Sequence, residues 1–173
     1  MMSTLDVIRD RRSIRRYANR AIPDTVLREI LEAARQAPSA ANRQPYRFIV
    51  VTDNALKRAL SKGLWNRFIK DAPVTIVGCA ETNGLTRKWA VIDTTIALQN
   101  MVIAAWSLGV GSCWIGDFNE PTVKTELRIP EKWTVVALLT LGYPGKQPRP
   151  RQKKSVEALV SYNGFERHGS NPL

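Results

Sequence analysis

The start of the chain contains a dense group of arginines with one serine that could bind a phosphate. The segment is Arg11-Arg12-Ser13-Ile14-Arg15-Arg16-Tyr17. A guanidinium presents a rigid fork of N–H donors that matches phosphate oxygens, and a serine hydroxyl adds a short donor. The alternative interpretation is a solvated basic face on the first helix, and this segment by itself favours that alternative.

A second group of cations lies near the other end of the chain. Residues 145–154 are rich in proline and cations, and they include Arg149-Pro150-Arg151. Alternate residues of an extended backbone face the same way, so both guanidiniums are expected on one side. This segment repeats the character of the N-terminal group.

Two further segments could bring backbone close to a flat ligand. Residues 37–46 are a run of small and amide residues between two prolines, and residues 109–118 place Trp114 and Ile115 between glycines. Ordinary turn chemistry and structural glycines are the alternative interpretations. The second segment is not a nucleotide-binding GxGxxG motif, because it follows a predicted helix and no helix opens directly after it.

Composition favours one domain over residues 1–173 with an anionic partner. The chain has 44% hydrophobic residues, a formal charge of +11 and a pI near 10.2. Such charge suits nucleic acid, a membrane surface, or a phosphorylated or acidic small molecule. Cys79 and Cys113 lie in apolar runs without a CxxC pair. With no signal-peptide pattern and no apolar run of about 18 residues, we expect a cytoplasmic protein without a membrane span.

Several chemistries are disfavoured by the residues present. His168 is the only histidine, and it is expected to be solvated and idle. The sequence therefore lacks the catalytic groups Ser-His-Asp and Cys-His, and it lacks the metal-binding patterns HExxH and Cys/His clusters. No Walker lysine follows a glycine loop, and the carboxylates are scattered without an acid–base pair. We expect no metal and no catalytic side chain, so that a cofactor would supply the chemistry of an enzyme.

Hydrophobic periodicity and breaker residues predict the elements that position these segments. The long central helix is apolar almost all the way round, which is typical of a helix buried in a core or an interface. Its polar residues Asp93, Gln99 and Asn100 are expected to bond to nearby backbone. The predicted helices span residues 5–12, 24–37, 55–60, 89–108 and 121–127, an amphipathic piece spans 64–70, and the predicted strands span 47–51, 74–79 and 133–141.

Together, these segments resemble the nitroreductase family of FMN-dependent oxidoreductases, specifically its short form. They occur in the family's order and span nearly the whole chain. Each is weak alone, but the set is specific. The matching segments are residues 11–17, 37–48, 71–74, 97–100, 109–118, 141–144 and 149–151.

The resemblance implies an α+β fold, a three-layer sandwich with a mostly antiparallel central sheet flanked by helices, and an interlocked homodimer with two FMN sites at its interface. It also implies an FMN-dependent NAD(P)H oxidoreductase. Such an enzyme passes a hydride from NADH or NADPH to tightly bound flavin and on to a quinone, nitroaromatic or similar acceptor by ping-pong exchange.

Family motifs carried onto this sequence imply its cofactor-binding residues. The FMN phosphate would be held by cations from both ends of the chain, and the 38–42 loop would reach the flavin of the other subunit. Asn66 would place its amide against the pyrimidine end of the flavin ring. Residues 114–116 would lie along the ring, with a backbone amide near Gly116 donating to the flavin N5. The full set is Arg11, Arg12, Ser13, Arg15, Pro38, Ser39, Ala40, Asn42, Asn66, Trp114, Ile115, Gly116, Arg149 and Arg151.

The sequence departs from the family pattern at two places. Many relatives carry hydroxyl residues at the positions of Ala40 and Ala41. The lysine often found near the flavin N1 and O2 edge has no clear counterpart, Lys70 being a poor positional match.

Two other functions stay open at this point. The same scaffold supports reductive dehalogenation and oxygen-dependent flavin fragmentation, but the short loop at 81–88 offers little room for the lid that such relatives carry. A basic nucleic-acid-binding module is disfavoured, since the aromatic residues lie in apolar runs and no helix-turn-helix or RNP signature occurs.

Overall fold

The computed structural model describes residues 3–84 and 87–165, so that His168 lies outside the described residues. The four strands form one antiparallel sheet in the order β1-β2-β4-β3. These strands are β1 (Tyr46–Val51), β2 (Val74–Glu81), β3 (Gly111–Ile115) and β4 (Trp133–Gly142). The helices are α1 (Thr4–Asp10), α2 (Asp24–Arg35), α3 (Asn54–Leu60), α4 (Arg87–Ser107) and α5 (Glu120–Leu127), with 3-10 turns η1 (Ala40–Asn42) and η2 (Arg67–Asp71).

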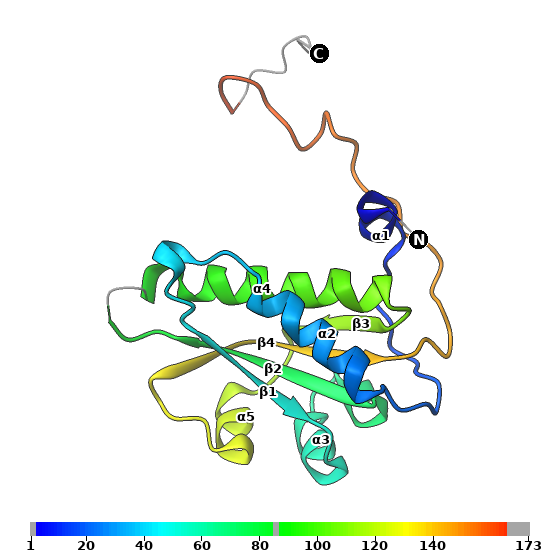
Figure 1. The fold of residues 1–173 in the computed structure, drawn as a ribbon, viewed down its shortest axis with the longest axis vertical. Helices are drawn as coiled ribbons and strands as arrows, with labels where there is room; N and C mark the ends of the chain where they lie inside the picture. The colour runs from blue at the N-terminus through cyan, green and yellow to red at the C-terminus, as the bar shows by residue number, and fades with distance from the viewer. Residues whose placement is uncertain (1–2, 85–86, 166–173) are drawn as a thin grey trace.

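Helices cover both faces of this sheet. Helices α2 and α4 lie on one face and α3 and α5 on the other (Figure 1). Each face has its own apolar cluster, one containing Ile30, Leu98 and Leu139, the other Leu60 and Leu138. Neighbouring residues of β4 point to opposite faces, which is how Leu138 and Leu139 enter different clusters. The predicted three-layer α+β sandwich is confirmed.

The long helix α4 is apolar on its outer side as well as its inner side. Leu98 and Met101 are fully buried against the sheet, whereas Trp89, Val91 and Ile92 are 45%, 41% and 48% exposed. Within residues 3–84 and 87–165, no helix combines the length and the apolar character needed to cross a bilayer. The outer side of α4 is therefore an uncovered apolar surface in the single chain.

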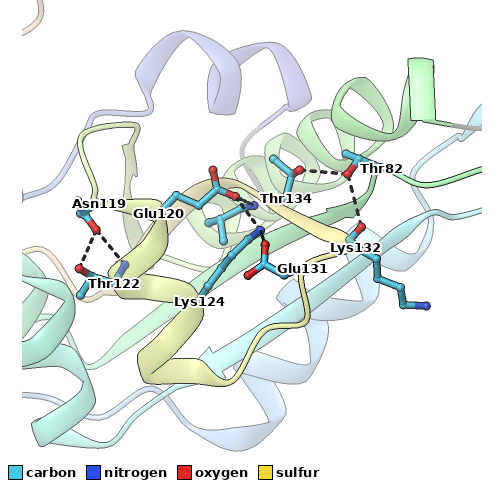
Figure 2. Close-up of polar contacts among 9 residues, drawn as sticks. Thr82, Asn119, Glu120, Thr122, Lys124, Glu131, Lys132 and Thr134 are labelled. Atoms are coloured by element: carbon cyan, nitrogen blue, oxygen red, sulfur yellow. Dashed lines mark hydrogen bonds and ion pairs between the residues drawn. The ribbon is translucent and has the colours of Figure 1, made fainter.

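Side-chain caps and ion pairs dock α5 onto β4 (Figure 2). Asn119 caps the helix by accepting a hydrogen bond from the Thr122 N–H at 2.9 Å. The Glu120 carboxylate accepts from the backbone N–H of Val135 in β4 at 2.9 Å. Lys124 lies 3.3 Å from Glu131 in the turn that leads into β4. These contacts fix the loop 116–119, which connects β3 to α5.

The structure differs from the predicted elements in the N-terminal helix and in β3. The first helix ends at Asp10, so Arg11 and Arg12 lie beyond it, because the backbone leaves the helical conformation at Arg11, where ψ is 142°. The glycine-rich segment 109–118 contains the edge strand β3, which pattern alone did not predict. A strand of five residues that begins with a glycine and is followed by another is too short to show a clear alternation.

A short segment after α1 joins the ends of β3 and β4. The Ile14 N–H donates to the carbonyl of Ser112 at 2.9 Å, and the Gly145 N–H donates to the carbonyl of Arg16 at 2.9 Å. The Tyr17 hydroxyl donates to the carbonyl of Ile14 at 2.6 Å and lies 2.7 Å from Thr140 Oγ1. Ile14 itself is fully buried. We call residues 13–17 the N-terminal tether.

From the hydrogen bonds of the tether we expect the protein to lose stability against unfolding when the Tyr17 hydroxyl is removed. Tyr17→Phe leaves the Ile14 carbonyl without its donor, so we expect the free energy of unfolding at pH 7 to fall by about 1–2 kcal/mol. Denaturant unfolding measures this difference. Tyr143→Phe is the control, because it keeps the ring that lies 3.8 Å from the Arg20 guanidinium. An equal loss in both variants would contradict the role of the Tyr17 hydrogen bonds.

The same hydroxyl predicts a pH dependence. Burial raises the pKa of Tyr17 above its ordinary value of 10.0. Above that pH the unfolded chain loses the Tyr17 proton more readily than the folded chain, so this contribution to stability is full below about pH 10 and is lost as the pH rises further. We expect Tyr17→Phe to show a shallower alkaline loss of stability than the unsubstituted protein in denaturant melts.

Candidate functional site

Cations from both ends of the chain line one cavity of about 450 Å³. We call it the cationic cavity. All of the residues that the resemblance implies for phosphate binding, the arginines of both ends and the serine, line it. The lining residues are Ile8, Arg9, Arg11, Arg12, Ser13, Arg15, Pro148, Arg149, Pro150, Arg151 and Lys153.

The N-terminal tether explains why the two ends meet. Tyr17 forms an isolated antiparallel bridge with Pro144, directly after β4, and Ser13 forms a parallel bridge with Ser112 at the edge strand β3. The chain that leaves β4 therefore starts beside the tether. The few residues from Pro144 to Arg149 then carry the C-terminal arginines to the N-terminal ones.

Arg12 offers donors suited to a bound anion. Its Nη1 donates to the backbone carbonyls of Arg9 at 2.8 Å and Arg11 at 2.9 Å, which fixes the guanidinium at the end of α1. Its Nε is buried and has no hydrogen-bond partner among the described residues. A buried N–H without an acceptor is costly, so Arg12, which lines the cavity, retains one unused donor. The residues of the cationic cavity thus fit a phosphate.

A line of contacts connects this cavity to Asn66 and to the end of β3. The Arg15 guanidinium carbon lies 5.9 Å from the centre of the Phe68 ring in η2. Asn66, 1% exposed, precedes η2. Its Oδ1 accepts from the Gly63 N–H at 2.8 Å, and its Nδ2 donates to the carbonyl of Asp117 at 2.8 Å. Asn66 therefore locks two loops together beside Gly116, and its contact with a flavin stays a prediction.

The end of β3 presents open backbone. Gly116 is exposed, and a Cβ built on it would meet no atom within 4 Å. The preceding residues are held in place: Ile115 is 4% exposed in the core, and Trp114 Nε1 donates to Gln99 Oε1 at 3.2 Å. A flat group could approach the backbone at Gly116 without a side chain in its way.

The 38–42 loop lies apart from the cationic cavity within one chain. Ala40 is bonded to Asp93 near the start of α4, whereas Arg12 shares a second cavity with Trp106 near the end of α4. At 1.5 Å per residue, the helix from Asp93 to Trp106 spans roughly 20 Å. A single chain therefore does not bring Pro38, Ser39, Ala40 and Asn42 to the cationic cavity.

Sequence reasoning missed three residues around this site. Arg9 and Lys153 line the cationic cavity, and the signal was available because each stands two residues from an implied arginine. Trp65 is 79% exposed, and its backbone N–H donates to Asp117 Oδ2 at 3.1 Å. Its exposure had no sequence signal, since it lies in a segment predicted to be amphipathic.

We expect substitution by alanine to have different effects on stability at two glycines of this region. At Gly111 the added Cβ would collide with Ile14 of the tether, so we expect Gly111→Ala to lose about 1–3 kcal/mol of unfolding free energy. At Gly116 the space is open, so we expect Gly116→Ala to be unchanged or up to about 1 kcal/mol more stable. Denaturant melts of both variants measure the difference, and equal losses would contradict the described packing.

Comparison with known proteins agrees with this architecture. The model of the nitroreductase family matches residues 8–68 and 57–143. A crystal structure of a nitroreductase family protein from Clostridium novyi NT is 36% identical with a TM-score of 0.77, covering 83% of this chain and 86% of that one. An FMN-dependent nitroreductase from Clostridium difficile R20291 is 28% identical with a TM-score of 0.82, covering 93% and 99%.

A curated relative gives the same result at the level of sequence. The NADH dehydrogenase of Thermus thermophilus is 32% identical, and the alignment covers 87% of this chain and 91% of the relative. The family match extends over most of the chain, and the relatives align along nearly their whole length. The chain therefore belongs to the nitroreductase family.

Proposed function

We propose that this chain is an FMN-dependent NAD(P)H oxidoreductase that reduces a small acceptor such as a quinone or a nitroaromatic by ping-pong exchange. The observation that carries the proposal is the meeting of N-terminal and C-terminal cations around one cavity. A solvated helix face explains neither the C-terminal arginines nor the buried, unpartnered Nε of Arg12. Relatives named as an FMN-dependent nitroreductase and an NADH dehydrogenase support the cofactor and the donor.

The cationic cavity would hold the FMN phosphate. Arg11, Arg12, Ser13 and Arg15 would contribute from the N-terminal side, and Arg149 and Arg151 from the C-terminal side. Charge-assisted hydrogen bonds from guanidinium to phosphate are roughly twice as strong as neutral ones. Arg9 and Lys153 add positive charge to the lining, which would increase the rate of encounter with an anionic cofactor.

The end of β3 would face the flavin ring. Trp114 and Ile115 fix the strand, and the open backbone at Gly116 lets the ring come close. Asn66 would hold the neighbouring loop at the distance that the ring requires. When bound, FMN would supply the hydride-transfer chemistry between NADH or NADPH and the acceptor. A backbone N–H near Gly116 would donate to the ring edge where charge develops.

A second copy of the chain would complete the site. The outer side of α4 is apolar and uncovered, and the C-terminal segment runs away from the three layers without packing on them (Figure 1). That segment exposes Val156, Leu159 and Phe165, which are 66%, 67% and 95% exposed. A homodimer would cover both surfaces and would bring the 38–42 loop of one subunit to the cationic cavity of the other.

Removal of single cations predicts weaker FMN binding. We expect Arg11→Gln and Arg151→Gln each to raise the Kd for FMN about 5- to 30-fold, equivalent to about 1–2 kcal/mol per charge-assisted contact. Quenching of flavin fluorescence during titration of the flavin-free protein measures the Kd. Riboflavin, which has no phosphate, should bind the variants and the unsubstituted protein equally.

The matched control for these variants is an arginine outside the cavity. Arg28 is exposed on α2, and Arg28→Gln removes the same charge from the protein as a whole. We expect its Kd for FMN to stay within about twofold, because Arg28 does not line the cationic cavity and an exposed charge is screened by salt. An equal loss in Arg28→Gln would mean that net charge, not the cavity, attracts the phosphate.

The activity is tested with the flavin-loaded protein. NADH and NADPH should each be oxidised in the presence of a panel of quinones and nitroaromatics, and initial rates at several donor and acceptor concentrations should give the parallel double-reciprocal lines of ping-pong exchange. Absence of flavin absorbance in the purified protein, together with no affinity for added FMN, would overturn the proposed function.

The dimer is tested through the C-terminal segment. Sedimentation should give twice the mass of one chain for the unsubstituted protein. We expect the combined change Val156→Ser and Leu159→Ser to raise the dimer dissociation constant at least about tenfold, because two exposed aliphatic side chains would lose their cover at roughly 1.5–3 kcal/mol each. If the double variant has the same dimer dissociation constant as the unsubstituted protein, the C-terminal segment has no role in association.

A further inference from the structure

A buried carboxylate holds the loop 38–44. Asp93, in the second turn of α4, is 4% exposed. Its two oxygens lie 3.3 and 3.2 Å from the backbone N–H of Ala40. Among the described residues, no lysine or arginine lies within ion-pair distance of Asp93. A buried carboxylate without a cation is unusual, since burial of a charge is costly unless hydrogen bonds compensate for it.

The loop that Asp93 holds is strained. Ala41, Asn42 and Gln44 have φ values of 51°, 53° and 50°, in the left-handed region that residues with a Cβ rarely adopt. Such clusters persist only where the surroundings enforce them, and they concentrate at functional sites. Asn42 is exposed, so its conformation does not follow from burial.

The hydrogen bonds of the loop divide into two groups. Within the loop, Ser39 Oγ accepts from the Gln44 N–H at 3.0 Å, and the Ser39 carbonyl accepts from the Asn42 N–H at 2.9 Å. These bonds join residues of the loop to one another and do not connect it to α4. Among the described residues, the hydrogen bond from the Ala40 N–H to Asp93 is the one that joins this turn to α4.

We propose that Asp93 is a positioning residue of the flavin site: its carboxylate anchors Ala40 so that the strained 38–44 loop is presented, already ordered, to the flavin of the partner subunit. This inference rests on the proposed function. Ordering the loop before binding lowers the entropy lost when the cofactor docks. Ala40 and Ala41 carry no polar side-chain atom, so these two residues can donate or accept hydrogen bonds only through their backbone groups, and such contacts depend on the position of the loop.

The inference is tested with two substitutions of Asp93 and one control. Asp93→Asn keeps an acceptor oxygen of the same shape but loses the charge, and Asp93→Leu removes the acceptor. Asn100→Leu is the matched control, because Asn100 on the same helix donates to the carbonyl of Ala33 at 3.1 Å in α2, away from the loop. Two readouts are taken: amide hydrogen exchange of residues 38–45 in the flavin-free protein, and the Kd for FMN from fluorescence quenching.

We expect a graded response in both readouts. Exchange in residues 38–45 should quicken at least about tenfold in Asp93→Leu and less in Asp93→Asn, with no change in Asn100→Leu. The Kd for FMN should rise about tenfold in Asp93→Leu and about threefold in Asp93→Asn, and should stay within twofold in the control.

The possible results separate this inference from the proposed function. If the unsubstituted protein binds FMN and both Asp93 variants bind it as tightly, or if their exchange in residues 38–45 is unchanged, the anchoring role is overturned and the proposed function stands. If the unsubstituted protein does not bind FMN, the proposed function fails and this inference fails with it. A loss of equal size in Asn100→Leu would show that Asp93 acts through general stability, which also overturns the inference.

Discussion

The arrangement of the site depends on the pairing of the N-terminal tether with the ends of β3 and β4. Ile14 is buried against β3 and bonded to Ser112, and Tyr17 is bonded near the end of β4. Gly111 allows this close approach, because a larger residue there would collide with Ile14. Without this pairing, both terminal segments would carry their arginines into solvent independently. The tether converts two basic stretches of sequence into one cavity.

That convergence has an electrostatic cost. Guanidinium groups gathered around one cavity repel one another, and solvent screens the repulsion only in part over a Debye length of about 8 Å at physiological salt. Within the described residues, the cavity-lining cations have one close acidic neighbour, Asp6, which lies 3.3 Å from Arg9. Guanidinium groups held together in this way favour the binding of an anion, and a dianionic phosphate reduces their mutual repulsion more than a monoanion does.

Helix α4 connects the parts of the molecule that the proposed function uses. Its inner side packs on the sheet through Leu98 and Met101, and its start anchors the 38–44 loop through Asp93. Its outer side exposes Val91 and Ile92. One helix therefore supplies core packing, the loop anchor and an apolar surface for association. Because its apolar residues surround it, no choice of orientation could bury all of them within one chain.

Much of the secondary structure followed from local sequence. The β-branched, aromatic and apolar content of residues 47–51, 74–79 and 133–141 predicted β1, β2 and β4, and helical spacing with proline and glycine boundaries predicted α2, α4 and α5. The set of motifs spread along the sequence also resembled one family closely enough for its fold to be predicted. The edge strand β3 was missed, because its pairing with β4 and not its composition makes it a strand.

The sequence by itself determined the types of residue available: arginines at both ends, a loop of small residues, glycines beside Trp114, and no histidine placed for acid–base chemistry. Only the tertiary structure decided which of them meet. It placed Arg149 and Arg151 beside Arg11, and it left Ala40 at the far end of α4. It also gave the polar residues of that helix their individual partners, Asp93 with Ala40, Gln99 with Trp114 and Asn100 with Ala33. The physical reason is that local propensity depends on neighbours along the chain, whereas these contacts depend on sheet pairing between residues far apart in sequence.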